Sequence, residues 1–234
     1  MEWFGLVTLL IGWGLGIASH IVVEAISRRH RVDRFRATSS EELRTIAIRY
    51  VWLVWKLESR IGGPDSDLAR WLSGKLVELE GASLSQATRE LAEKLKSYSE
   101  EQMTLLRDVE LVRATGDALG IKPFGLPYLS SQIQLIPELP LALQLSFLEV
   151  LSLHERINHE IAVAESFFLR TFDSSLTPEN HGIIKDNLIS SYQSLSKRAR
   201  QLVDEITNAR ALLGSSVIPA RAEESQLKKG AVSG

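Results

Sequence analysis

The N-terminal segment of the chain constrains its fold more than any other part. Residues Trp3 to Val23 form a stretch of 21 residues without a formal charge. At a rise of about 1.5 Å per residue, a helix of this length covers roughly 30 Å, the thickness of the hydrocarbon core of a bilayer. The sequence therefore predicts a single transmembrane anchor within residues 1–27.

Five arginines follow this segment and predict its orientation. Only Asp33 opposes them, and nothing basic precedes the segment except the terminal amine. Because basic residues stay on the cytoplasmic side, we expect a bacterial-type inner-membrane protein with its N-terminus outside and its bulk in the cytoplasm. A cleaved signal peptide would need a basic start, whereas the chain begins Met1-Glu2. The juxtamembrane segment 28–37 serves as a topology signal and suits anionic lipid headgroups through Arg28, Arg29, Arg31, Arg34 and Arg36.

One face of the predicted anchor carries small and ionisable residues at every fourth position. Gly12 and Gly16 form a GxxxG motif, and small residues at this spacing let two transmembrane helices approach closely. His20 and Glu24 continue the face at the cytoplasmic end, where their polar groups reach the interface. The pattern predicts self-association through the face formed by Thr8, Gly12, Gly16, His20 and Glu24.

The composition argues against several classes of function. A net charge of −2 argues against a nucleic-acid-binding protein, which needs a basic surplus. The absence of cysteine excludes disulfides, thiolate metal sites and cysteine nucleophiles. Residues 215–234 are small, polar and mixed in charge, so we expect a disordered tail there.

After the juxtamembrane segment, helical periodicity dominates and no strand-like alternation persists. Ser39 and Glu42 form a capping-box pattern, so a helix is expected to begin near Ser39 and to end at Gly62-Gly63-Pro64. A short helix near Ser66 to Glu80 follows. These two helices are interpreted as a possible sub-lobe, 38–81.

Three longer helices are expected to form a core, 83–214. They run from about Leu84 to Leu119, from Pro140 to Phe172, and from the cap Thr177-Pro178-Glu179 to Gly214. Their apolar residues alternate in steps of three and four, which is typical of helices packed at shallow angles. The predicted fold is all-α: a single transmembrane helix followed by a cytoplasmic antiparallel bundle, 38–214, whose first helix closes the core as a fourth. The same seams would also serve pairing between subunits.

The connection from Gly120 to Leu141 is rich in proline and carries charge only at Lys122 and Glu138. It is too apolar for a solvated linker and too long for an ordinary structureless loop. Three interpretations stay open. The segment packs along the bundle as a buried crossover, rests on the membrane or another subunit, or docks a partner through the PxxP motif that begins at Pro137.

The string HERINHE, residues 154–160, comes close to a zinc-binding HExxH motif without matching it. His154 and His159 point about 140° apart on a regular helix, so they cannot hold one ion. His154 falls on the apolar seam, where a core histidine with a hydrogen-bonding neighbour is expected. Because midpoints meet in an antiparallel bundle, we predict a buried polar layer of Gln102, His154 and Tyr192 that fixes the register.

No nucleophile elbow, phosphate loop or dinucleotide motif is present, so the sequence predicts no catalytic, cofactor or metal site. The favoured function is a membrane-anchored, non-enzymatic interaction, scaffold or regulatory module. Anchoring supports this interpretation, because tethering raises the local concentration of a weak binding module. We expect the protein to be oligomeric and to contact membrane lipid and a protein partner of unknown identity. The alternative is a membrane effector or pore component assembled through the glycine face. An enzyme with an unrecognised site is the second alternative.

Overall fold

The structure, a computed structural model, describes residues 2–63, 65–80, 86–99, 101–106, 108 and 121–215; near the N-terminus, side chains are described for residues 13, 15, 16 and 19–63. Its elements are α1 (Glu2–Ile61), α2 (Ser66–Glu80), α3 (Gln86–Ser97), α5 (Pro127–Ser131), the 3-10 helix η2 (Ile133–Glu138), α6 (Leu141–Arg170) and α7 (Pro178–Ser215). No strand occurs among the described residues. The prediction of an all-α fold is confirmed.

A single helix of 60 residues, α1, covers the predicted anchor, the juxtamembrane segment and the first helix of the bundle. The predicted helix start at Ser39 is therefore wrong. Ser39 lies inside α1, where its side chain is fully buried and its hydroxyl has no hydrogen-bond partner among the described residues. Residues 25–38 contain no glycine or proline to interrupt the helix, and a capping box has a role only at a free helix N-terminus.

The predicted end of this helix is confirmed. The amides of Gly62 and Gly63 donate to the carbonyl of Glu58 at 3.2 and 3.0 Å, and Gly63 has a φ of 81°. A glycine in this left-handed conformation is a common way to end a helix. The following helix, α2, has the predicted bounds, and the Asp65 carboxylate accepts the amide of Leu68 at 2.7 Å as its N-terminal cap.

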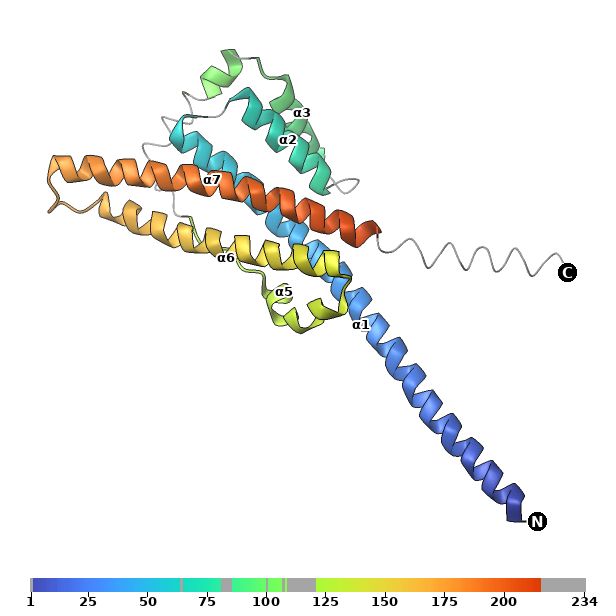
Figure 1. Ribbon diagram of the computed structural model, residues 1–234. Coiled ribbons are helices and arrows are strands. Elements are labelled where there is room, and N and C mark those ends of the chain that lie inside the picture. Colours follow the sequence, from blue (N-terminus) through green and yellow to red (C-terminus); the bar gives the residue numbers. More distant parts are fainter. Residues whose placement is uncertain are drawn as a thin grey trace.

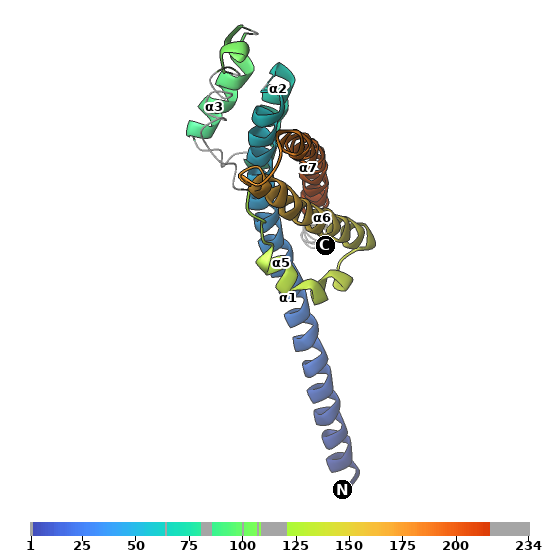
Figure 2. The same cartoon turned by 90° about the vertical axis from the view of Figure 1, so that its left-hand side faces the viewer.

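The second half of α1 forms the core with α6 and α7, and α6 and α7 lie side by side in opposite directions (Figure 1). The N-terminal half of α1 projects away from this bundle (Figures 1 and 2). The apolar seams predicted for the two long C-terminal helices are buried except at Phe168 and Leu188, which are half-buried. The buried positions are Leu143, Phe147, Val150, His154, Ile157, Ile161 and Ala164 in α6, and Tyr192, Leu195, Ala199, Leu202, Ile206, Ala209 and Leu213 in α7.

The starts of α6 and α7 also agree with the sequence. α6 begins directly after Pro140, and its last residue, Arg170, lies two positions before the predicted end. At α7 the hydroxyl of Thr177 accepts the amide of Asn180 at 3.3 Å, so the predicted cap is confirmed. The short connection between them makes the two helices antiparallel neighbours.

The predicted long helix from Leu84 to Leu119 is interrupted in the described residues. α3 ends at Ser97, and a separate helical segment covers residues 101–106. That segment has its own capping box, because the Ser99 amide donates to the Gln102 side chain at 2.9 Å and the Gln102 amide donates to the Ser99 hydroxyl at 3.3 Å. α3 packs against α2 (Figure 2), so α1 takes the core position predicted for this helix. The rest of the predicted helix lies outside the described residues.

The described part of the proline-rich connection, residues 121–139, packs along the bundle and rests on α1 through α5 and η2. Leu126, Leu129, Ile136 and Leu139 are buried. Glu42 of α1 accepts the first amides of α5, from Tyr128 at 2.8 Å and from Leu129 at 2.7 Å. The interpretation as a buried crossover is confirmed for this part. Glu42 therefore caps α5, not the helix start predicted at Ser39.

Among the described residues, no helix combines the length and the apolar character that crossing a membrane requires. Most side chains of the predicted span, including those of Thr8 and Gly12, lie outside the described residues.

Candidate functional site

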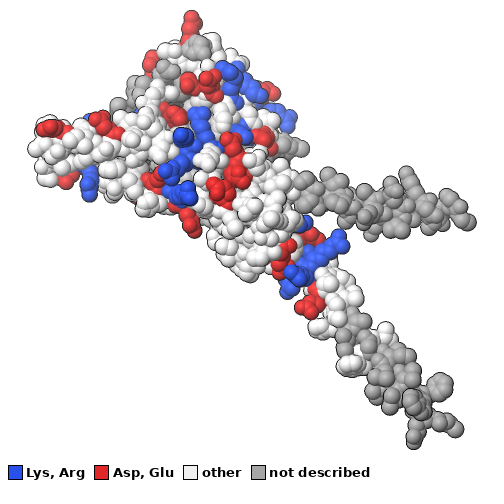
Figure 3. Space-filling view, in the orientation of Figure 1, with Lys and Arg blue, Asp and Glu red and all other residues white. Residues whose placement is uncertain are grey.

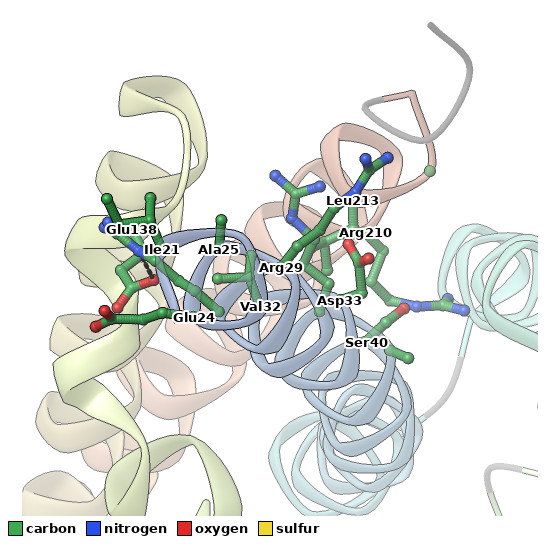
Figure 4. Close-up of a pocket in the computed structure, with 14 residues that line it drawn as sticks. Ile21, Glu24, Ala25, Arg29, Val32, Asp33, Ser40, Glu138, Arg210 and Leu213 are labelled. Carbon is green, nitrogen blue, oxygen red and sulfur yellow. Dashed lines mark hydrogen bonds and ion pairs between the residues drawn. The ribbon is translucent and has the colours of Figure 1, made fainter. Parts of the chain in front are cut away.

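A groove with a volume of about 1130 Å³ lies where the projecting half of α1 leaves the bundle (Figure 4). Most of its lining comes from residues 21–40 of α1. Glu138 of η2 lies at one end of the groove, and Arg210 and Leu213 of α7 lie at the other. The groove therefore depends on three segments that only the tertiary fold brings together.

Charged side chains gather on α1 at the same point (Figure 3). The charged residues of the groove are Arg28, Arg29, Arg36, Arg210, Glu24, Asp33 and Glu138. Arg28 Nε and Glu138 Oε2 are 2.9 Å apart, so these two charges compensate each other. The predicted set of headgroup arginines is thus divided, because Arg31 and Arg34 are exposed but line no part of the groove.

Arg36 and Arg210 are the partly buried cations of the groove. The Nε atom of each is buried and has no hydrogen-bond partner among the described residues, and neither guanidinium forms an ion pair with a described carboxylate. Burial lowers the pKa of Arg210, the positive charge of Arg44 lowers it further, and Glu41 offsets part of the change. A partly desolvated cation whose charge is only partly compensated is unfavourable, so this end of the groove favours an anion.

The sequence did not predict that Arg210 and Glu138 belong to a site. Arg210 follows the buried seam residue Ala209 and looks like an ordinary charged residue at the edge of an amphipathic helix. Its terminal nitrogen donates to the carbonyl of Leu79 in α2 at 3.1 Å, which fixes the side chain between helices. Only the packing of α7 against α1 places it beside the arginines of the juxtamembrane segment.

An uncharged surface lies over the crossover and the start of α6, on the side from which α1 projects (Figure 3). We call it the apolar end surface, and its residues are Ile133, Leu141, Leu145 and Leu148, each at least half exposed. An apolar surface next to a basic groove suits contact with the interface of a membrane, where acyl chains and charged headgroups meet.

The predicted polar layer of Gln102, His154 and Tyr192 is wrong in its composition. Gln102 is exposed and its side chain caps the segment 101–106. His154 is buried in the core, as predicted, but its neighbours are Tyr50 and Asn158: Tyr50 Oη and His154 Nδ1 are 2.9 Å apart, and Asn158 Nδ2 and His154 Nε2 are 3.2 Å apart. Tyr192 is buried in α7 without a described hydrogen bond to either of the other two.

The backbone of Phe124 determines the protonation pattern of this network. Its amide donates to Asn158 Oδ1 at 3.1 Å and its carbonyl accepts from Asn158 Nδ2 at 2.8 Å, so the Asn158 amide presents an N–H to His154 Nε2. This arrangement fits the neutral tautomer of His154 with its proton on Nδ1, which donates to the Tyr50 oxygen. Burial lowers the pKa of His154, with a partly compensating contribution from the Phe124 backbone, and burial raises the pKa of Tyr50. The network is neutral and structural.

The described part of the predicted self-association face is uncovered. Gly16, His20 and Glu24 are exposed on the projecting half of α1, and His20 Nδ1 lies 3.9 Å from Glu24 Oε2. A Cβ atom added at Gly16 would meet no heavy atom within 4 Å. The face is open to a neighbouring helix, and self-association through it stays a prediction.

Comparisons with known proteins give no further information. No protein family, curated protein or solved structure shows significant similarity to this chain.

Proposed function

We propose that the protein is a membrane-anchored, non-enzymatic interaction module. In this proposal the N-terminal half of α1 spans an inner membrane, and the helical bundle works at its cytoplasmic surface as part of an oligomer that holds a protein partner. For the alternative of an enzyme with an unrecognised site, the described residues give no specific observation in favour.

The observation that carries the proposal is the exposure of apolar side chains on the projecting half of α1. Trp13, Leu15, Ile21, Val22 and Val23 are each more than half exposed. At 100° per residue they lie at about 0°, 200°, 80°, 180° and 280° around the helix axis, so they face several sides of the helix. Large apolar side chains exposed on several sides of one helix need a cover. A lipid bilayer covers a lone helix on every side, whereas one protein partner covers a single face.

The position of the charges supports the predicted orientation. The arginine-lined groove and the apolar end surface both lie where α1 leaves the bundle. If residues up to about Val23 lie in the hydrocarbon core, these two surfaces lie at the depth of the headgroups. Basic residues on this side agree with a cytoplasmic bundle.

The test is crosslinking with mass spectrometry in intact bacterial membranes, comparing the full chain with a variant that lacks residues 2–27. The described core begins near Phe35, so the variant should retain its helical circular dichroism. We expect it to leave the membrane fraction and to lose the crosslinks of the full chain. If the same crosslinks form from the soluble fraction, the anchor has no role and the proposal fails.

A second comparison separates this proposal from a membrane effector or pore component. Gly12→Leu and Gly16→Leu place large side chains on the predicted self-association face and keep two such helices apart. An interaction module should lose crosslinks between its own copies and keep those to its partner. A pore component should instead lose the ability to permeabilise vesicles, and finding such an activity in the full chain would favour that alternative.

A further inference from the structure

We propose that the groove beside α1 binds a phosphate group through Arg29, Arg36 and Arg210 (Figure 4). The ligand class is therefore a phosphate ester or inorganic phosphate.

The distribution of charge along the groove favours an anion at one end. Glu24 and Glu138 lie at the end formed by η2, and Glu138 is paired with Arg28. At the opposite end, Arg29 and Arg210 lie near Asp33 (Figure 4). Arg29, Asp33, Arg36 and Ser40 follow one another at steps of three and four, so they share one face of α1. In the lining at this end, three guanidinium groups thus face one carboxylate, and Glu41, outside the lining, offsets only part of the charge of Arg210.

Two of these guanidinium groups are already held partly out of water. The buried Nε atoms of Arg36 and Arg210 have no hydrogen-bond partner among the described residues, although α1 carries Asp33 in the lining of the same groove. The packing of α1, α2 and α7 holds these cations in place, so a bound anion would compensate charges that are already positioned. Guanidinium groups bind phosphate oxygens through paired N–H donors, which makes phosphate a better match than a simple halide ion.

The remaining lining indicates what accompanies the phosphate. Ile21, Ala25, Val32 and Leu213 contribute apolar surface to the same groove. A volume of about 1130 Å³ is far larger than a phosphate ion needs, so the groove has room for an attached organic part. Both a lipid headgroup and a soluble phosphate ester have this chemistry. The binding of phosphate does not require the proposed anchoring, but the choice of a lipid as its source rests on it.

The experiment uses the full chain in two settings. In an uncharged detergent, inorganic phosphate is titrated and binding is followed by calorimetry. In nanodiscs of phosphatidylcholine, with or without phosphatidylglycerol, retained lipid is counted by native mass spectrometry. The variants are Arg36→Gln and Arg29→Gln, and the control is Arg156→Gln, which removes the same charge from an exposed position of α6 outside the groove.

We expect each groove variant to weaken binding roughly tenfold or more, because a charge-assisted hydrogen bond is lost, whereas the control changes it by less than about twofold. Arg29 is exposed, so its variant should fold even if Arg36→Gln does not. If the groove variants lose the binding of inorganic phosphate in detergent, the ligand is a soluble phosphate. If they lose only the bound phosphatidylglycerol in nanodiscs, the ligand is a lipid headgroup. Absence of binding in both settings, or an equal effect of the control, overturns the proposal. A chain that binds phosphate but leaves the membrane would contradict only the proposed function.

Discussion

At the scale of single residues, the polar network around His154 shows what a sequence pattern can and cannot assign. The seam position of His154 predicted burial and a hydrogen-bonding neighbour, and both are confirmed. The neighbours were wrong, because the prediction paired midpoints of three helices that do not form the core together. Tyr50 lies on the apolar seam of α1, the helix that was expected only to close the bundle. Its hydroxyl forms a hydrogen bond with His154.

Tyr50→Phe tests the contribution of this network to stability. The variant leaves the His154 Nδ1 proton without its acceptor in the core, so we expect the free energy of unfolding to fall by about 1–3 kcal/mol. Tyr192→Phe is the matched control, because Tyr192 is also buried but has no described hydrogen bond. Urea unfolding followed by circular dichroism measures both. Equal losses for the two variants would contradict the assignment of the hydrogen bond.

The lowered pKa of His154 predicts a dependence of stability on pH. The unfolded chain binds a proton at His154 as pH falls through about 6.5, whereas the folded chain binds it only at lower pH. Stability from this group is therefore complete above that value and is lost as pH falls below it. The free energy of unfolding should be lower at about pH 5.5 than at about pH 7.5, and this difference should be smaller in His154→Gln. A decrease of the same size in the variant would assign the effect to other groups.

At the scale of elements, the continuity of α1 is the main departure from the predicted secondary structure. A capping box is a local pattern of two residues, and Ser39 and Glu42 fit it. Alanine and arginine make up half of residues 25–38 and no glycine or proline interrupts them, so the helix continues through Ser39 and the amides that a cap would satisfy already donate within it. The bundle and the projecting half of α1 consequently share one continuous helix.

Ser39→Ala distinguishes the two descriptions of this position. An N-cap serine would make the change cost about 1 kcal/mol. Because Ser39 is buried inside α1 with an unpaired hydroxyl, we expect the free energy of unfolding to stay the same or to rise. Thermal unfolding of the two proteins side by side measures the difference, and a clear loss of stability would restore the predicted helix start.

Glu42→Gln tests the cap that α1 provides for the crossover. The carboxylate accepts the amides of Tyr128 and Leu129, so the variant should expose these two amides to faster hydrogen exchange and destabilise α5. Glu41→Gln is the control, because Glu41 is the adjacent exposed carboxylate and pairs with Arg44 on the same helix. Hydrogen exchange read by mass spectrometry over residues 121–139 should change in the first variant alone. An equal change in both would indicate a general effect of charge.

At the scale of the whole molecule, most helix boundaries could be predicted from local signals, whereas the choice of the helices that form the core could not. α2, α6 and α7 follow from periodicity, caps and glycine or proline stops, which act within a few residues. The choice of α1 as the third core helix depends on which seams pack together, and several seams had the same spacing. The groove follows from that choice, because it requires α7 to bring Arg210 to the arginines of α1.

The proposed function requires that the projecting half of α1 crosses a membrane and leaves the bundle on the cytoplasmic side. The chain contains no cysteine, so single thiols can be introduced without other changes. Glu2→Cys places a thiol before the proposed span, and Glu155→Cys places one in the bundle. A membrane-impermeant maleimide is then applied to spheroplasts before and after permeabilisation. We predict that the thiol at position 2 reacts in intact spheroplasts and that the thiol at position 155, exposed on α6, reacts only after permeabilisation. Reaction of both positions only after permeabilisation, with the chain released by alkaline carbonate, would contradict the account.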